Sequence, residues 1–342
     1  MEFGICSFAD TGIDSATGKR INAHQRLKEL IEEIELVDQL GFDVFALGEH
    51  HRIDYAASAP AIILAAAAAR TKKVKLSTAV TVLSTDDPVR VFQQFATIDL
   101  LSEGRAEIMA GRGSFTESYP LFGYDLHDYD ELFEEKLNLL LQLNKSEKIT
   151  WKGQYRTPLN NAGIYPRPYQ KEIPIWIAIG GTPESAMRAG RLGLPLTLAI
   201  IGGYPKSFAP IMELYRNTAK ENGNEEKIKV GINTHVYVAE TSQQAADEFA
   251  PPYLQVMNMI GKERGWSGMT REQFDMMRTP QASLMVGSPQ QVIDKMLYEY
   301  ELFRYDRFLA QMSIGALPHK QLMKAIELFA TKVVPEIRKA VQ

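Results

Sequence analysis

Short runs of β-branched and other apolar residues alternate with longer amphipathic segments along this 342-residue chain. Such an alternation predicts strands that are each followed by a helix, which is typical of a parallel sheet with helices outside it. The eight predicted strands are residues 3–8, 43–47, 74–83, 105–110, 173–179, 195–201, 229–239 and 307–312. The main predicted helices are residues 22–40, 58–70, 88–101, 128–143, 183–192, 205–222, 242–263, 289–303 and 320–338.

Repeated right-handed crossovers close most naturally into a (β/α)8 TIM barrel. A doubly wound sheet is the alternative, but it needs a reversal of strand order and usually has fewer units. The length would suit two average domains, yet no linker or shift in composition divides the chain. We therefore expect one α/β domain over residues 1–342.

Two segments interrupt the alternation. Residues 148–168, after the fourth helix, are rich in Pro, Gly and Asn and predict an insertion that contains a hairpin. Residues 265–282, before the last barrel unit, read as a long irregular loop. Long loops are uncommon unless they are functional, so we expect this segment to have a function.

Composition excludes several classes of function. The net charge is −4 and no basic block occurs, so nucleic acid is not expected as a partner. The longest apolar stretch, residues 59–69, is far shorter than the ~20 residues that span a membrane, and the start lacks a signal-type segment. Cys6 is the only cysteine, which excludes an internal disulfide. We expect a cytoplasmic protein without a membrane partner.

The sequence Glu49-His50-His51 follows the second predicted strand, at the end where barrels keep their chemistry. Side chains alternate along a strand, so Glu49 and His51 are expected to share one direction and His50 to take the other. Imidazole is the natural general base near neutral pH, which favours an acid–base or hydrogen-bonding role. The alternatives are histidines satisfied by the backbone, or zinc ligands. The HExxH pattern is absent, and the other histidines lack ligand-like spacing, so no metal site is predicted.

Two glycine-containing turns could hold an anion. Gly180, Gly181 and Thr182 lead from a strand into a helix, where Thr182 is a good N-cap and free amides favour phosphate. Arg112 lies between two glycines, where its planar guanidinium suits an anion or a polar ring edge. Neither turn has the spacing of a P-loop or dinucleotide fingerprint. An ordinary βα turn and a surface arginine are the alternatives.

Motifs along nearly the whole chain resemble the bacterial luciferase-like flavin-dependent monooxygenase family. The first is Gly-Phe-Asp-x-x-x-x-Gly-Glu-His-His at residues 41–51. The others are STAVTVL at 77–83, DPVR at 87–90, DLLSEGR at 99–105, AGRG at 110–113, IWIAIGGTPES at 175–185, RLGLP at 191–195 and VGSP at 286–289.

The resemblance implies roles for individual residues. His50 matches the imidazole that luciferases use near the flavin as catalytic base or hydrogen-bond partner. Ala79 and Val80 fall where the family often has a non-proline cis peptide under the isoalloxazine ring. Arg112 matches an arginine that contacts the flavin phosphate or polar edge. Residues 180–182 match the phosphate-binding turn, and residues 265–282 match a mobile lid.

The resemblance also implies a reaction. Reduced FMN, supplied by a separate flavin reductase, would work with O2 to oxygenate a small organic substrate, and a homodimer is the family habit. The run Ala65–Ala69 fits a dimer contact, although packing on the barrel explains it as well. The alternatives are a deazaflavin-dependent hydride-transfer oxidoreductase, a non-catalytic flavin-binding protein, and, more remotely, a zinc hydrolase.

Overall fold

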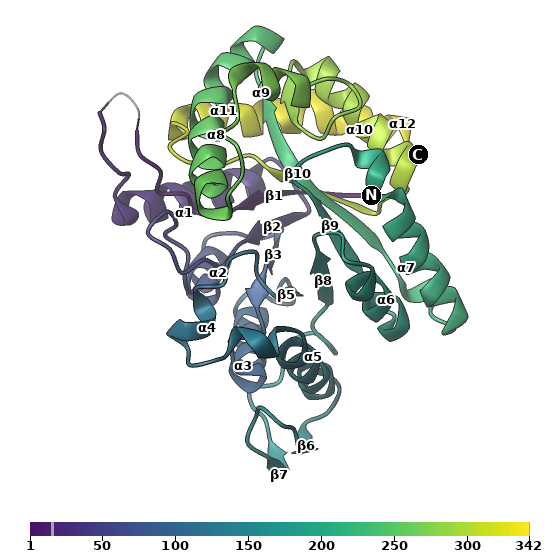
Figure 1. Ribbon diagram of the computed structural model, residues 1–342. Helices are drawn as coiled ribbons and strands as arrows, with labels where there is room; N and C mark the ends of the chain where they lie inside the picture. Colours follow the sequence, from purple (N-terminus) through teal and green to yellow (C-terminus); the bar gives the residue numbers. More distant parts are fainter. Residues whose placement is uncertain (15–16, 342) are drawn as a thin grey trace.

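A nearly closed barrel of parallel strands forms the centre of the molecule (Figure 1). The computed structural model describes residues 1–14 and 17–341. Nine strands follow one another in the order β3-β2-β1-β12-β10-β9-β8-β5-β4, and a parallel bridge between Leu76 and Ala106 joins β3 to the residues just before β5. The strands are β1 (Glu2–Ser7), β2 (Val44–Leu47), β3 (Lys75–Thr78), β4 (Thr81–Val82), β5 (Ile108–Gly111), β8 (Ile175–Ile179), β9 (Leu196–Ile200), β10 (Val230–Val238) and β12 (Arg307–Gln311). The predicted TIM barrel is confirmed.

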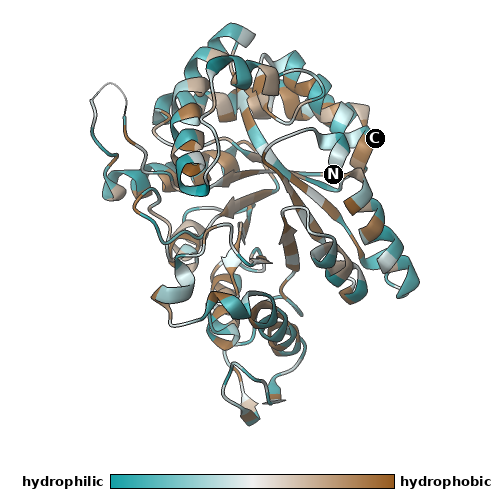
Figure 2. Cartoon of the chain, viewed as in Figure 1, coloured by the Kyte–Doolittle hydropathy of each residue, from teal (hydrophilic) through white to brown (hydrophobic). Residues whose placement is uncertain are grey.

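Helices cover the outside of the barrel. In Figure 2 the central strands are mainly brown, while the helices carry teal on their outer faces. Buried apolar side chains of the helices pack against the strands and form one large core. The helices are α1 (Ala23–Gln39), α2 (Pro60–Ala68), α3 (Pro88–Leu101), α4 (Ser118–Leu121), α5 (Tyr129–Lys145), α6 (Pro183–Leu192), α7 (Ala209–Glu221), α8 (Ser242–Arg264), α9 (Arg271–Met277), α10 (Pro289–Phe303), α11 (His319–Leu328) and α12 (Val334–Ala340).

The third predicted strand, residues 74–83, is not continuous. It consists of β3 and β4, which are separated by a cis peptide bond between Ala79 and Val80. The cis bond matches what the resemblance implied at this position. The pattern predicts an unbroken strand here because residues 77–83 are a continuous, largely β-branched run, as in a strand covered on both faces. Residues 76–78 and 81–83 are indeed buried.

The predictions for the two interrupting segments agree with the structure to different degrees. Residues 148–168 contain β6 (Lys148–Trp151) and β7 (Leu159–Gly163), which pair antiparallel, so the hairpin is present. Residues 265–282 were expected to be an irregular loop, and this is wrong in part because α9 lies within them. Thr270 and Gln273 form a capping box that starts this helix. Residues 285–287 form a strand that the pattern did not predict, β11 (Met285–Gly287), which pairs with β10.

Charged side chains fill the amino-terminal end of the barrel. Arg307 at the start of β12 donates to Glu107 Oε2 at 2.7 Å and to Glu2 Oε2 at 2.5 Å, and Lys75 donates to Glu2 Oε1 at 2.5 Å. The guanidinium of Arg307 also lies 4.1 Å from the ring centroid of Trp176. These charges satisfy one another, so this end of the barrel is closed. Within the described residues, no helix is long and apolar enough to cross a membrane.

Candidate active site

The main cavity lies at the carboxyl ends of the barrel strands and measures about 490 Å³. This is the end at which TIM barrels carry their active sites. Its apolar lining comes from Phe8, Tyr55, Met109, Phe115, Val256, Met257, Ile260, Trp266, Leu309 and Ile314. Its polar lining includes Asp10, His50, Arg112, Thr197, Asn233, His235, Arg264 and Gln311. An apolar cavity with a few polar groups is the usual form of a small-molecule site.

His50 is buried in the wall of this cavity. Its ring lies 4.3 Å from Tyr55, 4.7 Å from Phe8 and 5.3 Å from Phe115, measured between ring centroids. Burial, with smaller contributions from the neighbouring His51 and Arg52, lowers the pKa of His50 to about 3. The imidazole is therefore neutral at physiological pH. Its Nε2 atom is buried and has no hydrogen-bond partner within residues 1–14 and 17–341, so it is free for a ligand.

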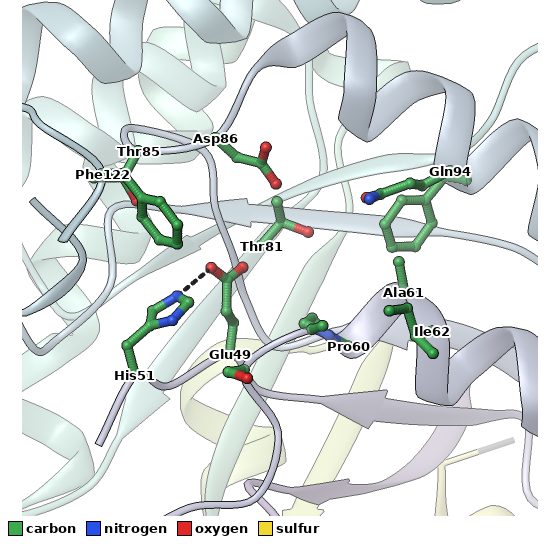
Figure 3. Close-up of a pocket in the computed structure, with 13 residues that line it drawn as sticks. Glu49, His51, Pro60, Ala61, Ile62, Thr81, Thr85, Asp86, Gln94 and Phe122 are labelled. Atoms are coloured by element: carbon green, nitrogen blue, oxygen red, sulfur yellow. Dashed lines mark hydrogen bonds and ion pairs between the residues drawn. The ribbon is translucent and has the colours of Figure 1, made fainter. Parts of the chain in front are cut away.

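His51 faces a second, smaller cavity of about 200 Å³ (Figure 3). Its Nε2 lies 2.9 Å from Glu49 Oε1, and the other Glu49 oxygen accepts a hydrogen bond from the Val82 backbone N–H at 3.0 Å. Asp86 lies across the same cavity, where burial raises its pKa. The different surroundings of His50 and His51 agree with the predicted alternation of directions. Glu49 borders both cavities and holds the start of β4 beside the cis peptide.

Arg112, Thr182 and Ser185 converge at the amino terminus of α6. Arg112 donates to Thr182 Oγ1 at 3.3 Å and to Ser185 Oγ at 3.0 Å, and it also pairs with Asp130. Thr182 is the N-cap residue, but its side chain accepts no capping hydrogen bond from described residues and donates to Ser185 instead. Pro183 has no N–H and the Ala186 N–H donates to the Thr182 backbone oxygen, so the N–H groups of Glu184 and Ser185 are the amides of the first turn that face a ligand, next to a guanidinium and two hydroxyl groups. Ser185 was in the quoted motif but was not predicted as a site residue.

Two glycines directly precede Thr182 in this cluster of Arg112, Thr182 and Ser185. A Cβ placed on Gly180 would meet no atom within 4 Å, and Gly181 has φ +111°, a backbone conformation that favours glycine. Gly180 lines the main cavity, whereas Gly181 and Thr182 lie at its edge next to α6. Ala79 and Val80 also line the cavity, and a Cβ on Gly111 would lie 2.8 Å from the Val80 side chain. Five predicted site residues therefore lie around one cavity: His50, Ala79, Val80, Arg112 and Gly180. Gly181 and Thr182 are not among the lining residues and follow Gly180 at the start of α6.

Sequence reasoning missed several polar residues of the strands and, after β1, Asp10. Asp10, Thr197, Asn233, His235 and Gln311 all line the cavity and are all buried. A signal for some of them existed, because residues 233 and 235 share one face of β10, whereas Ile232, Thr234 and Val236 share the other. That signal gives the face but does not tell whether a polar side chain already has a partner.

The end of α8 and the residues after it cover part of the cavity. Arg264 and Trp266 line it, and Arg264 donates to the Ser114 backbone oxygen at 2.8 Å. Arg52 donates to Glu263 on α8 at 2.5 Å and to Glu117 at 2.5 Å. The end of α8, just before the 265–282 segment, is thus tied to the loops after β2 and β5.

Comparison with known proteins identifies the class of this barrel. A family model of luciferase-like monooxygenases matches residues 1–306. The chain belongs to the luciferase-like monooxygenase family and is an oxidoreductase of that kind. It is 26% identical to an uncharacterised protein, y4vJ, of Sinorhizobium fredii over 92% of both chains. It is 29% identical to limonene 1,2-monooxygenase of Rhodococcus erythropolis over 70% of this chain and 62% of that protein.

Solved structures share the fold over nearly the whole chain. The monooxygenase RslO1 of Streptomyces bottropensis has a TM-score of 0.82 and 25% identity, and the match covers 98% of this chain and 99% of that one. The oxygenating constituent of 3,6-diketocamphane monooxygenase from Pseudomonas putida, solved with FMN, has a TM-score of 0.79 and 18% identity, with the same coverage of 98% and 99%. The F420-dependent tetrahydromethanopterin reductase of Methanopyrus kandleri has a TM-score of 0.74 and 21% identity, also covering 98% and 99%. The last two show the fold alone, and they bind different cofactors.

Proposed function

We propose that this protein is a flavin-dependent monooxygenase that uses reduced FMN and O2 to oxygenate a small organic substrate. The observation that carries the proposal is the anion site of Arg112, Thr182 and Ser185 beside the cavity of His50. A phosphate-bearing cofactor needs such a site, and the apolar cavity next to it has room for a ring system.

The residues present fit FMN. Arg112, Thr182, Ser185 and the amides that follow Gly180 and Gly181 would hold the phosphate, since they offer donors and positive charge. Ala79 and Val80, with their small and apolar side chains, would support the isoalloxazine ring on the cavity wall. Reduced FMN supplies the electrons that activate O2 for transfer of one oxygen atom to the substrate.

His50 is proposed to act near the flavin. Because burial lowers its pKa to about 3, the neutral ring serves as a hydrogen-bond partner and is a weak base at pH 7. The aromatic rings of Tyr55, Phe8 and Phe115 around it exclude water, which protects a reactive flavin. Trp266 and Arg264 extend this cover as part of the proposed lid, residues 265–282 with the end of α8.

The deazaflavin alternative has a specific observation behind it. An F420-dependent relative shares this fold over 98% of the chain, so the barrel alone does not select the cofactor. A hydride-transferring enzyme would turn over without oxygen. Oxygen uptake with reduced FMN, set against anaerobic turnover with reduced F420, separates the two. Aldehydes, sulfonates, cyclic ketones and amines form the first substrate panel.

The decisive binding experiment is a fluorescence titration of FMN into the protein. We expect Arg112→Ala to raise the FMN dissociation constant at least roughly tenfold, since a charge-assisted hydrogen bond contributes about 1.5–3 kcal/mol. Arg271→Ala is the matched control, because Arg271 lies on α9 and pairs with Asp247 and Asp275 outside the cavity. If Arg112→Ala and the parent protein bind FMN with equal affinity, the proposed phosphate site is wrong.

The proposal extends to partners. A separate flavin reductase would supply reduced FMN, and two copies of the chain would form a homodimer. The outer face of α2 and α3 supports the second point, because Ile62 is 71% and Leu101 is 59% exposed there. Sedimentation of the parent protein and of Ile62→Glu checks it. A monomeric parent protein would overturn the dimer and leave the flavin proposal intact.

A further inference from the structure

Two polar side chains stand side by side on the cavity wall that faces the proposed flavin site. His235 on β10 and Gln311 on β12 are direct partners in the register of these neighbouring parallel strands. Both side chains line the main cavity, and their residues are only 3% and 4% exposed. Their position is therefore fixed by the barrel itself and not by a loop.

Each of these side chains has an unused polar atom. His235 Nδ1 and Gln311 Oε1 are buried and have no hydrogen-bond partner in the part of the chain that the structure describes. Thr197 Oγ1, deeper on the wall, is in the same condition. Asn233 differs, because its Nδ2 donates to the Leu309 backbone oxygen at 3.2 Å. Buried polar atoms are rarely left unpaired in native proteins, so a ligand group is expected to pair with them.

The surroundings restrict this ligand to an uncharged molecule. Burial lowers the pKa of His235 to about 4, against a smaller opposite effect of a backbone hydrogen bond with Gln311, so the ring is neutral. Tyr253 packs edge-on against the ring at 5.5 Å, and Val256, Met257 and Ile314 line the cavity with it. His235 and Gln311 offer no charge to pair with a charged group placed between them, and such a group would lose its hydration. Asp10, a carboxylate that lines the same cavity, already accepts hydrogen bonds from Ser313 and from the Gly315 backbone N–H.

The wall lies across the barrel from the cis peptide. In the strand order, β2 and β1 separate β3 from β12, and β5, β8 and β9 separate β4 from β10. A flavin on Ala79 and Val80, with its phosphate at α6, would occupy the half of the cavity formed by β3, β4, β5 and β8. The half formed by β9, β10 and β12 remains for the substrate.

We propose that His235 and Gln311 bind the hydroxyl group of a neutral, mainly apolar substrate. This inference rests on the proposed function for the place of the flavin. A hydroxyl group fits because Gln311 Oε1 can only accept, and Nδ1 of the neutral His235 ring, which uses its one N–H toward the Gln311 backbone, also accepts. The hydroxyl proton is then shared between these two adjacent acceptors. A ketone or an ether has no proton for Gln311, and an ammonium group would bury an unpaired charge.

The test compares 2-naphthol with its methyl ether, 2-methoxynaphthalene, by calorimetric titration into the FMN-loaded protein. We expect naphthol to bind at least roughly tenfold more tightly than the ether, because a site built to pair with a hydroxyl group rejects the analogue that lacks it. Gln311→Leu and His235→Phe should each remove most of this difference by weakening naphthol alone. Met257→Leu, a cavity-lining control without a polar atom, should preserve it.

Three outcomes would overturn the inference. They are equal affinities for the two probes, a difference that persists in both variants, and no measurable binding of naphthol. An FMN titration of the parent protein and of each variant distinguishes these three outcomes from a failure of the flavin proposal. If the parent protein does not bind FMN, the flavin proposal fails. If FMN affinity falls in Gln311→Leu and His235→Phe while the naphthol preference is unchanged, these residues bind the flavin and not the substrate.

Discussion

The polar side chains at the two ends of the barrel differ in whether they have partners. At the amino-terminal end, Arg307, Glu107, Glu2 and Lys75 pair with one another. At the carboxyl-terminal end, His50 Nε2, His235 Nδ1 and Gln311 Oε1 have no partner in the described part of the chain. Both sets of side chains point into the same barrel.

The contrast is sharpest along β12, which contributes to both ends. Arg307 begins the strand and is fully paired, while Gln311 ends it with Oε1 free. The two residues are four positions apart, so they share one face of the strand. Polar residues of one strand therefore stabilise the fold at one end and remain available for a ligand at the other. This is the division of roles that TIM barrels in general show.

The largest effect is expected at the closed end. Arg307→Met leaves the buried carboxylate of Glu107 without its partner, and breaking such a pair costs about 3–5 kcal/mol in free energy of unfolding. FMN affinity should be unchanged where the variant is folded, because Arg307 is absent from the lining of the main cavity in the described residues. Urea unfolding and the FMN titration measure the two quantities.

The double variant Arg307→Met/Glu107→Met is the control for unpaired charge. It should recover much of the lost stability, because apolar side chains of similar volume can replace a buried ion pair. A single variant that loses less than about 1 kcal/mol, or that loses FMN affinity in proportion, would contradict the separation of the two ends.

The next effect is expected at the carboxyl-terminal, open end of the barrel, where a substitution should lower activity more than stability. His50→Ala should lower kcat at least roughly 10²-fold, the usual range for a residue that transfers a proton or hydrogen-bonds in the transition state. FMN affinity should change little, since His50 Nε2 has no partner to lose within the described residues. The free energy of unfolding should fall only through the lost packing of the buried ring against Phe8, Tyr55 and Phe115. Oxygen uptake with reduced FMN and a substrate from the panel measures kcat.

His51→Ala is the matched control for this prediction. It removes the partner of Glu49 and should lower stability by about 1 kcal/mol, with kcat kept within roughly threefold. If His51→Ala loses as much activity as His50→Ala, the assignment of His50 alone is wrong. Unchanged turnover of His50→Ala would remove its proposed role.

The sequence predicted the barrel because its signal is repeated and local. Strands buried on both faces appear as apolar runs, and each was followed by an amphipathic helix. It did not predict β11, α9 or the division of residues 74–83. The first two are only three and seven residues long, and their boundaries depend on tertiary packing and capping. The cis bond was implied by the resemblance and not by the pattern.

The site could be predicted in its loops but not in its strands. His50, Arg112 and residues 180–182 follow strand ends and have a local signature. Whether a polar residue inside a strand is free depends on its neighbours in three dimensions. Thr234 Oγ1 donates to the Ile200 backbone oxygen at 2.8 Å, whereas Thr197 Oγ1 has no described partner. Nothing in the sequence distinguishes these two threonines.

The third prediction concerns the pH dependence of the open end. Burial lowers the pKa of His50 to about 3, so the folded enzyme does not protonate this ring between pH 5 and 8. The ratio of kcat between the parent protein and His50→Ala should therefore change less than about twofold over that range. The prediction is wrong if kcat of the parent protein changes with an ionisation near pH 6.5 that is absent in His50→Ala. Such a result would show that His50 titrates like an exposed histidine because water reaches it in the cavity.

The smallest effect is expected outside the barrel, at His319, which lies 3.2 Å from Glu33 and 3.1 Å from Glu32. The hydrogen bond with Glu33 raises the pKa of His319 above 6.5. A raised histidine pKa adds stability that is complete below about pH 6.5 and is lost as the pH rises through the folded-state value. His319→Gln should thus cost more at pH 5.5 than at pH 9, and the difference should stay below about 1 kcal/mol because the pair is partly exposed. Urea unfolding at both pH values measures it. A larger loss of unfolding free energy at pH 9 than at pH 5.5 would contradict this prediction. It would indicate that the Glu33 carboxylate is stabilised by Arg26, its buried partner at 2.7 Å, and not by the charge of His319.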